Sequence, residues 1–255
     1  MLEAAGWDPT AEAARSALNR IVAFQETVSK HSMRTFPTFV LNDGAIAYRD
    51  LSPRSRNVTF DFLWRSVTLH AEINAAERAA GFPSARAVLA VGFRARRFVD
   101  YSQRLSTHEG LRIKEKLASG SIDPEQAINH ALLARHHSDS TPELQHNYAM
   151  TKAYLVDSAG SKAGFGGPRL FVDMNIFVAD QPKWAKFSET LDWSGRGMKG
   201  IFAAIDSLNI SHARRTQFQG VRDAFEIAQA LSPNPEILNI IRSSRLGNLR
   251  RPKLE

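Results

Sequence analysis

The spacing of apolar positions predicts a helix followed by a hairpin at the start of the chain. Between Ala11 and Lys30 apolar residues recur every three or four positions, and no proline or glycine interrupts them, which is typical of a helix. Two short apolar runs, 38–41 and 45–48, then flank the tight-turn signal Asn42-Asp43-Gly44. We therefore expect a β-hairpin with Asp43 at its tip.

The next segments alternate between helical and extended patterns. A long helix is expected over Val58–Ala80, because apolar residues recur without a breaker until Gly81-Phe82-Pro83. The run Ala87–Phe93 is almost continuously apolar, which indicates a strand covered on both faces and hence a central place in the sheet. Arg169–Asp173 reads as another strand. The predicted fold class is α/β, with a central mixed sheet flanked by helices.

Domain organisation follows from changes in this pattern. We expect an α/β core over residues 1–175, interrupted at about 98–146 by a polar helical insertion, with a helix start at Asp123-Pro124-Glu125. Residues 176–255 are expected to form a helical extension that ends in a basic tail. The apolar face of this helical part consists of Phe218, Val221, Phe225 and Ala228. The basic tail contains Arg242, Arg245, Arg250, Arg251 and Lys253.

Composition narrows the functional classes. The chain of 255 residues has no cysteine, which excludes disulfides, thiolate metal sites and a cysteine nucleophile. No apolar run approaches the roughly 20 residues of a membrane helix and no secretory signal is present, so we expect a cytoplasmic protein without a membrane partner. The net charge of +7 favours phosphate-bearing partners, such as nucleotides or nucleic acid.

Asp43 is the first candidate for chemistry. A carboxylate at a hairpin tip suits Mg²⁺ bound to a nucleoside triphosphate, because this ion takes one or two carboxylates and completes its shell with phosphate and water oxygens. The alternative is that Asn-Asp-Gly simply forms the turn.

Two further groups have both a functional and a structural interpretation. The glycines of 160–167, with Lys162 among them, either cradle phosphate or form a loop, although neither common phosphate-loop spacing is present. The second group consists of four histidines and one aspartate that lie close together in the sequence. They either bind a divalent metal ion or lie on solvated helix ends, and they match no recurrent metal-binding motif. This second group comprises His130, His136, His137, Asp139 and His146.

Amide and cationic side chains form the last group. Asn147 and Lys152 share a predicted helix over 143–156, while Arg86 and Arg94 flank the apolar strand and are candidate nucleotide-binding residues. Such groups stabilise the charge that spreads over phosphate oxygens during phosphoryl transfer. The alternative is a set of solvated helix and strand ends.

The order of these pieces resembles the catalytic core of class III nucleotidyl cyclases, most closely the divergent bacterial branch that includes the pyrimidine cyclases of antiphage signalling. The likeness covers roughly 11–173 and rests on the acidic hairpin, the long helix, the strand ending Val91-Gly92-Phe93-Arg94, the helix with Ala153-Tyr154, and Pro168–Asp173. It implies that Asp43 binds Mg²⁺ or Mn²⁺, that Asn147 faces the phosphates of a nucleoside triphosphate, and that the protein is a homodimer.

The chain departs from the family pattern at two places. No strand ending in aspartate precedes the first helix, and Thr151 stands where the family carries arginine, with the cation Lys152 one position further. A step of one residue turns a side chain by about 100° around a helix, and lysine lacks the planar fork of arginine. A catalytically inactive, cyclase-like interaction protein is therefore the first alternative, and a basic nucleic-acid-binding protein is the second.

Overall fold

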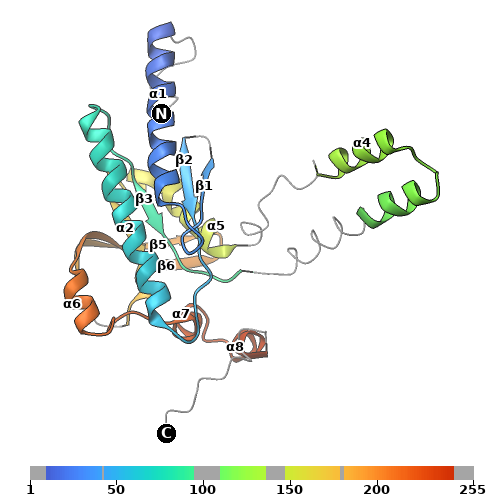
Figure 1. The fold of residues 1–255 in the computed structure, drawn as a ribbon. Coiled ribbons are helices and arrows are strands. Elements are labelled where there is room, and N and C mark those ends of the chain that lie inside the picture. Colours follow the sequence, from blue (N-terminus) through green and yellow to red (C-terminus); the bar gives the residue numbers. More distant parts are fainter. Residues whose placement is uncertain (1–9, 42, 95–109, 136–146, 179–180, 244–255) are drawn as a thin grey trace. The chain divides into compact units, whose positions relative to one another are not determined.

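The structure, a computed structural model, describes residues 10–41, 43–94, 110–135, 147–178 and 181–243 (Figure 1). It divides into two compact units, one formed by Met1–Val91 with Ala153–Glu255 and the other by Gly92–Lys152. The larger unit holds two sheets flanked by helices, which confirms the predicted α/β class.

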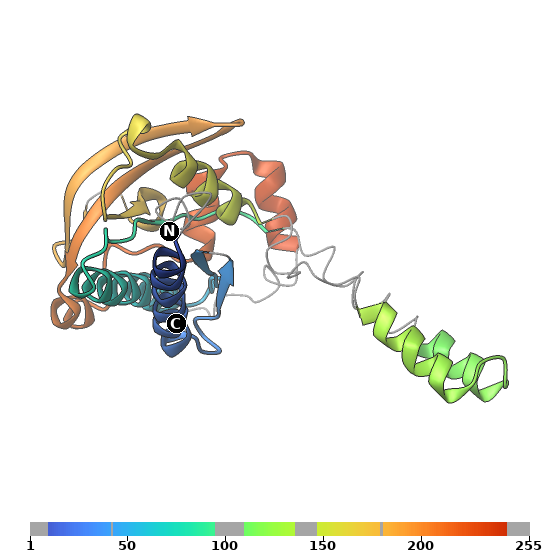
Figure 2. The same ribbon diagram turned by 90° about the horizontal axis from the view of Figure 1, so that it is seen from above.

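The N-terminal helix, hairpin and long helix form as predicted. Helix α1 (Ala11–His31) begins at Thr10, whose side chain accepts a hydrogen bond from Ala13 N, and α2 spans Arg56–Ala79. The two helices lie side by side (Figure 2). Strands β1 (Thr38–Leu41) and β2 (Gly44–Ala47) pair antiparallel in a two-stranded sheet of their own.

The second sheet has four strands in the order β3-β4-β6-β5. Strand β3 (Ala87–Leu89) runs parallel to β4 (Leu170–Asp173), while β6 (Met198–Leu208) is antiparallel to both β4 and β5 (Ala185–Gly195). The central place expected for 87–93 is wrong, because β3 lies at the edge of this sheet.

Both faces of the four-stranded sheet are nevertheless covered. Leu89, Val91 and Val172 pack in one cluster with Phe60 and Leu63 of α2. On the other face, Val88 and Ala90 pack against a cluster made of Val156, Phe165, Phe171, Trp193, Phe202 and Ala204. The apolar run therefore correctly predicted a strand buried on both faces. It did not indicate whether that strand has one or two neighbouring strands.

The C-terminal third contains strands that the sequence did not predict. The extension expected to be helical from residue 176 starts with the short 3₁₀ helix η5 (Met174–Ile176) and the β5–β6 hairpin. Helices α6 (Ile210–Arg215), α7 (Ala224–Leu231) and α8 (Pro235–Ser243) follow. The face expected over 218–228 begins only at Ala224, because Asp223 and Glu226 form a capping box there. Among the basic tail residues, only Arg242 belongs to a described element.

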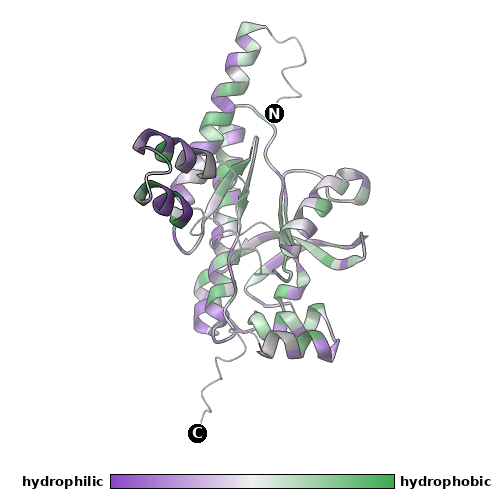
Figure 3. Cartoon of the chain, turned by 90° about the vertical axis from the view of Figure 1, so that its right-hand side faces the viewer, coloured by the Kyte–Doolittle hydropathy of each residue, from purple (hydrophilic) through white to green (hydrophobic). Residues whose placement is uncertain are grey.

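The smaller unit is mainly helical in its described part. Residues 110–118 are helical, α4 spans Pro124–Arg135 and α5 begins at Tyr148 and ends at Ala159. The first two lie within the insertion predicted at about 98–146. Hydrophilic and hydrophobic residues are mixed along the helices of the chain (Figure 3). None of the described helices has the length and apolar content needed to cross a membrane.

Candidate functional site

Asp43 lies in the turn between β1 and β2, and its side chain is exposed. The neighbouring Asn42 lies outside the described residues. The hairpin belongs to the two-stranded sheet, so the carboxylate stands at the tip of that sheet rather than on the larger one. Within the described ranges no three histidine or acidic side chains gather as a metal-binding group. An exposed carboxylate at a hairpin tip is the kind of ligand that Mg²⁺ combines with phosphate and water oxygens.

Arg94 and Asn147 are brought together by the fold. They form an isolated antiparallel bridge, and Tyr148 N next to it donates a 2.9 Å hydrogen bond to Phe93 O. The Asn147 side chain is mostly buried, and its Oδ1 accepts a hydrogen bond from Met150 N at 3.0 Å. The backbones of two of the predicted site residues, a cation and an amide, are therefore paired at the start of α5.

Gly92 makes this approach sterically feasible. A Cβ atom at this position would lie 2.5 Å from Ala149 N and 2.9 Å from Ala149 Cα. Both are backbone atoms, so no side-chain rotation relieves such a clash. The glycine in Val91-Gly92-Phe93 is thus needed for the contact that carries Arg94 to Asn147.

Lys152 is only 3% exposed, and its side chain is not free of partners. Thr151, the residue in the family's arginine position, donates from Oγ1 to Asn147 O at 3.1 Å. An ammonium group is buried at low cost only when it is paired or hydrogen-bonded. The contact of Lys152 with phosphate remains a prediction from the resemblance.

Arg86 is fully engaged by neighbouring groups. Its Nε donates to Asp157 Oδ1 at 2.7 Å, Nη2 donates to Asp157 O at 2.9 Å and Nη1 donates to Phe165 O at 2.6 Å. These bonds fasten the residue before β3 to the C-terminal part of α5 and to the loop after it. Arg86 positions these segments, and its predicted contact with a nucleotide stays a prediction.

Asp173, the last residue of β4, is a buried carboxylate. It is fully buried, and its carboxylate accepts hydrogen bonds from Val91 N at 3.3 Å, Asn175 N at 3.0 Å and Asn175 Nδ2 at 2.9 Å. The pattern Asp-Met-Asn after an apolar strand is the signal that could have indicated this turn, since a short acidic side chain caps the backbone two residues on.

The remaining candidates separate in the structure. His130 is exposed on α4, whereas the other members of its group, at 136–146, lie outside the described residues. The glycine segment forms the 3₁₀ helix η4 (Gly160–Ala163), followed by Gly164 and Gly167 with positive φ angles of 87° and 76°. Because glycine adopts positive φ angles without steric cost, the turn conformation explains the glycines at these two positions.

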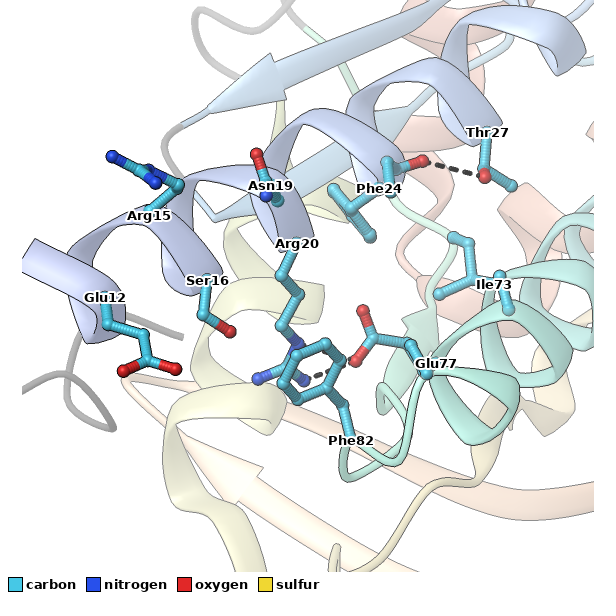
Figure 4. Close-up of a pocket in the computed structure, with 13 residues that line it drawn as sticks. Glu12, Arg15, Ser16, Asn19, Arg20, Phe24, Thr27, Ile73, Glu77 and Phe82 are labelled. Carbon is cyan, nitrogen blue, oxygen red and sulfur yellow. Dashed lines mark hydrogen bonds and ion pairs between the residues drawn. The ribbon is translucent and has the colours of Figure 1, made fainter.

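A cavity of about 420 Å³ lies between α1 and α2 (Figure 4). Arg20 and Glu77 form an ion pair inside it, with Arg20 Nε donating to Glu77 Oε2 at 2.7 Å, and Arg20 also stacks over the Phe82 ring. Arg20 Nη2 donates a further bond to Pro83 O at 2.9 Å. These contacts pin α1 to the C-terminal end of α2.

A buried polar network joins α2 to the segment before β3. Asn74 is 3% exposed, and its Oδ1 accepts from Ala85 N at 2.6 Å. His70 Nε2 lies 3.0 Å from Ala85 O, and burial lowers the pKa of this imidazole below its usual 6.5.

This network predicts a pH effect on stability. The unfolded chain takes up a proton at His70 at higher pH than the folded chain does, so folding free energy is lost as pH falls below about 6.5. The loss from one proton is at most about 1.4 kcal/mol per pH unit. Urea titrations of wild type and His70→Asn between pH 7.5 and 5 measure it. An identical pH slope in both proteins would contradict the assignment.

No protein-family model, characterised protein or solved structure matches this chain.

Proposed function

We propose that this chain is a divergent cytoplasmic nucleotidyl-cyclase-like domain that binds a nucleoside triphosphate with a divalent metal ion. The observation that carries the proposal is the pairing of Arg94 with Asn147 at the start of α5. A cation and an amide side by side near the N-terminus of a helix suit phosphate oxygens.

The proposal gives each residue a separate role. Asp43 binds Mg²⁺ or Mn²⁺ through its exposed carboxylate, and phosphate and water oxygens complete the coordination shell of the ion. Asn147 and Lys152 act on the phosphates, as the resemblance implies. In bacterial signalling or antiphage defence, an active form would release a cyclic nucleotide, and it would work as a homodimer.

Thermal unfolding with ATP, GTP, CTP or UTP and Mn²⁺ tests the proposal. A ligand at 100 times its Kd stabilises the folded state by about 2.7 kcal/mol. For a chain of this size we expect one nucleotide to raise Tm by about 5 °C or more. Asp43→Ala and Arg94→Gln should each remove most of that rise.

Glu26→Ala is the matched control, since it removes an exposed carboxylate on α1, remote in sequence from all proposed site residues. It should keep the full nucleotide-induced rise in Tm. The proposal fails if none of the four nucleotides raises Tm, or if the rise is unchanged in both Asp43→Ala and Arg94→Gln.

A non-catalytic interaction protein is the second candidate, and the helical part of the smaller unit favours it. Leu111, Leu117 and Ile128 are 54%, 40% and 61% exposed on residues 110–118 and on α4. Several large apolar side chains exposed on neighbouring helices are typical of a surface that another protein covers. If the protein has this function, the hydrogen bonds of Arg86 and the helix cap formed by Asn147 only stabilise the fold and bind no nucleotide.

Light scattering combined with the nucleotide titration separates the two candidates. The interaction function predicts no nucleotide-induced rise in Tm, together with an assembly that Ile128→Asp dissociates at unchanged helix content. A nucleotide-induced rise that survives Ile128→Asp supports nucleotide binding instead.

A further inference from the structure

A second cavity, of about 720 Å³, lies in the larger unit beside the β5–β6 hairpin. Its floor is one face of the hairpin, where Asp192 is directly opposite Ile201 and Ser194 is opposite Lys199. Residues directly opposite each other on paired strands, and those two positions along, point to the same side of a sheet. None of these residues belongs to the proposed nucleotide site.

The wall of the cavity is fixed by main-chain hydrogen bonds. Val178 N donates to Gly220 O and Arg222 N donates to Ile176 O, both at 2.8 Å, and Phe177 forms a bridge with Val221. The backbone that carries Val178 and Arg222 is therefore held in place before any ligand arrives. Preorganised sites lose less conformational entropy on binding.

Two apolar side chains that line this cavity are partly exposed. Ile201 is 47% exposed on the floor and Val178 is 37% exposed on the wall, and both line the cavity. A single exposed apolar residue needs no explanation, but two that face one hollow provide a surface for an apolar ligand group.

The charges at the same cavity point to an anion. Arg222 Nη1 donates to Asn175 O at 3.4 Å, and no carboxylate in the described part of the chain forms an ion pair with this guanidinium. Lys199 is a second cation at the cavity, against the single acid Asp192. The planar fork of arginine binds carboxylate, sulfonate or phosphate through two parallel hydrogen bonds.

We propose that this cavity binds a small organic anion, whose charged group is bound by Arg222 and Lys199 and whose apolar body lies between Val178 and Ile201. The hollow is open to solvent on one side, so a ligand reaches it without a change in the fold. Asp192 favours a ligand that also carries a hydroxyl or amine donor beside the apolar body. This site is independent of the proposed nucleotide function.

Fluorescence titration with 8-anilinonaphthalene-1-sulfonate tests the site, because this probe combines a sulfonate with an aromatic body. Arg222→Gln should raise its Kd at least about tenfold, because it removes the positive charge and the planar fork that bind the sulfonate. Ile201→Glu places a like charge on the floor and should abolish binding. If Arg222→Gln does not fold, Lys199→Gln tests the same requirement for positive charge at an exposed strand position. It should also raise the Kd of the probe.

Two controls match the variants in type. Leu18→Glu changes a residue that is 60% exposed on α1, and Arg215→Gln removes an exposed cation on α6, so both should bind the probe like wild type. Octanoate should displace the probe and acetate at equal concentration should not. Unchanged binding in Arg222→Gln and Ile201→Glu, or equal displacement by acetate, would overturn the proposal.

Discussion

Glu77→Ala is expected to lower the free energy of unfolding by about 3–5 kcal/mol, because it leaves the Arg20 guanidinium buried without its carboxylate. The two side chains are only 12% and 6% exposed, so solvent screens their attraction little in the folded chain. Urea denaturation monitored by circular dichroism measures the loss. The same change should also weaken the packing of α1 against the C-terminal end of α2, because this ion pair joins the two helices there.

The double variant Arg20→Met with Glu77→Met should recover most of this loss, since apolar side chains of similar length replace a buried ion pair at little cost. Glu72→Ala is the matched control on the same helix. Its pair with His31 also joins α1 to α2, but the Glu72 side chain is 56% exposed, so we expect a change below about 1 kcal/mol. Equal losses for Glu77→Ala and Glu72→Ala would contradict a special role for the buried pair.

Gly92→Ala is expected to destabilise the smaller unit by about 2–3 kcal/mol, because its new Cβ would meet the Ala149 backbone at 2.5 Å. The strand end must then move away from α5, which separates Arg94 from Asn147. We therefore expect Gly92→Ala to lose the nucleotide-induced rise in Tm as well. Thermal unfolding with and without the nucleotide measures both effects.

Gly110→Ala is the control within the same unit, since nothing lies within 4 Å of the Cβ that it would add. An alanine at this helical position should leave stability unchanged or raise it by up to about 1 kcal/mol. An unchanged Tm in Gly92→Ala would show that the close contact between the strand end and α5 is not formed in solution.

Local signals account for the elements that the sequence predicted well. The uninterrupted apolar spacing of α1 and α2 and the turn residues before Gly44 act over a few neighbouring residues, so their boundaries fell within a few positions of the prediction. The β5–β6 hairpin was missed although its strands alternate between exposed and partly buried positions at many places. Its turn at Arg196 and Gly197, with φ angles of 47° and 78°, has no strong turn signal at the first position.

The place of β3 illustrates the limit of a burial pattern. An apolar run indicates that both faces of a strand are covered. Helices can cover both faces of an edge strand as well as those of a central strand. Strand order depends on which distant segments pair, and no residue within 87–93 encodes that choice.

The sequence by itself determined the α/β class, the first two helices and the hairpin with Asp43, because local spacing suffices for these. Its candidate site residues, Arg94 and Asn147 among them, stay predictions. Only the tertiary structure decided which of them meet. It paired Arg94 with Asn147, tied Arg86 to Asp157 and buried Asp173 at a turn. It also brought Arg222 and the exposed Ile201 to the lining of one cavity. These contacts join residues far apart in the chain, so they arise from packing of whole elements rather than from local propensity.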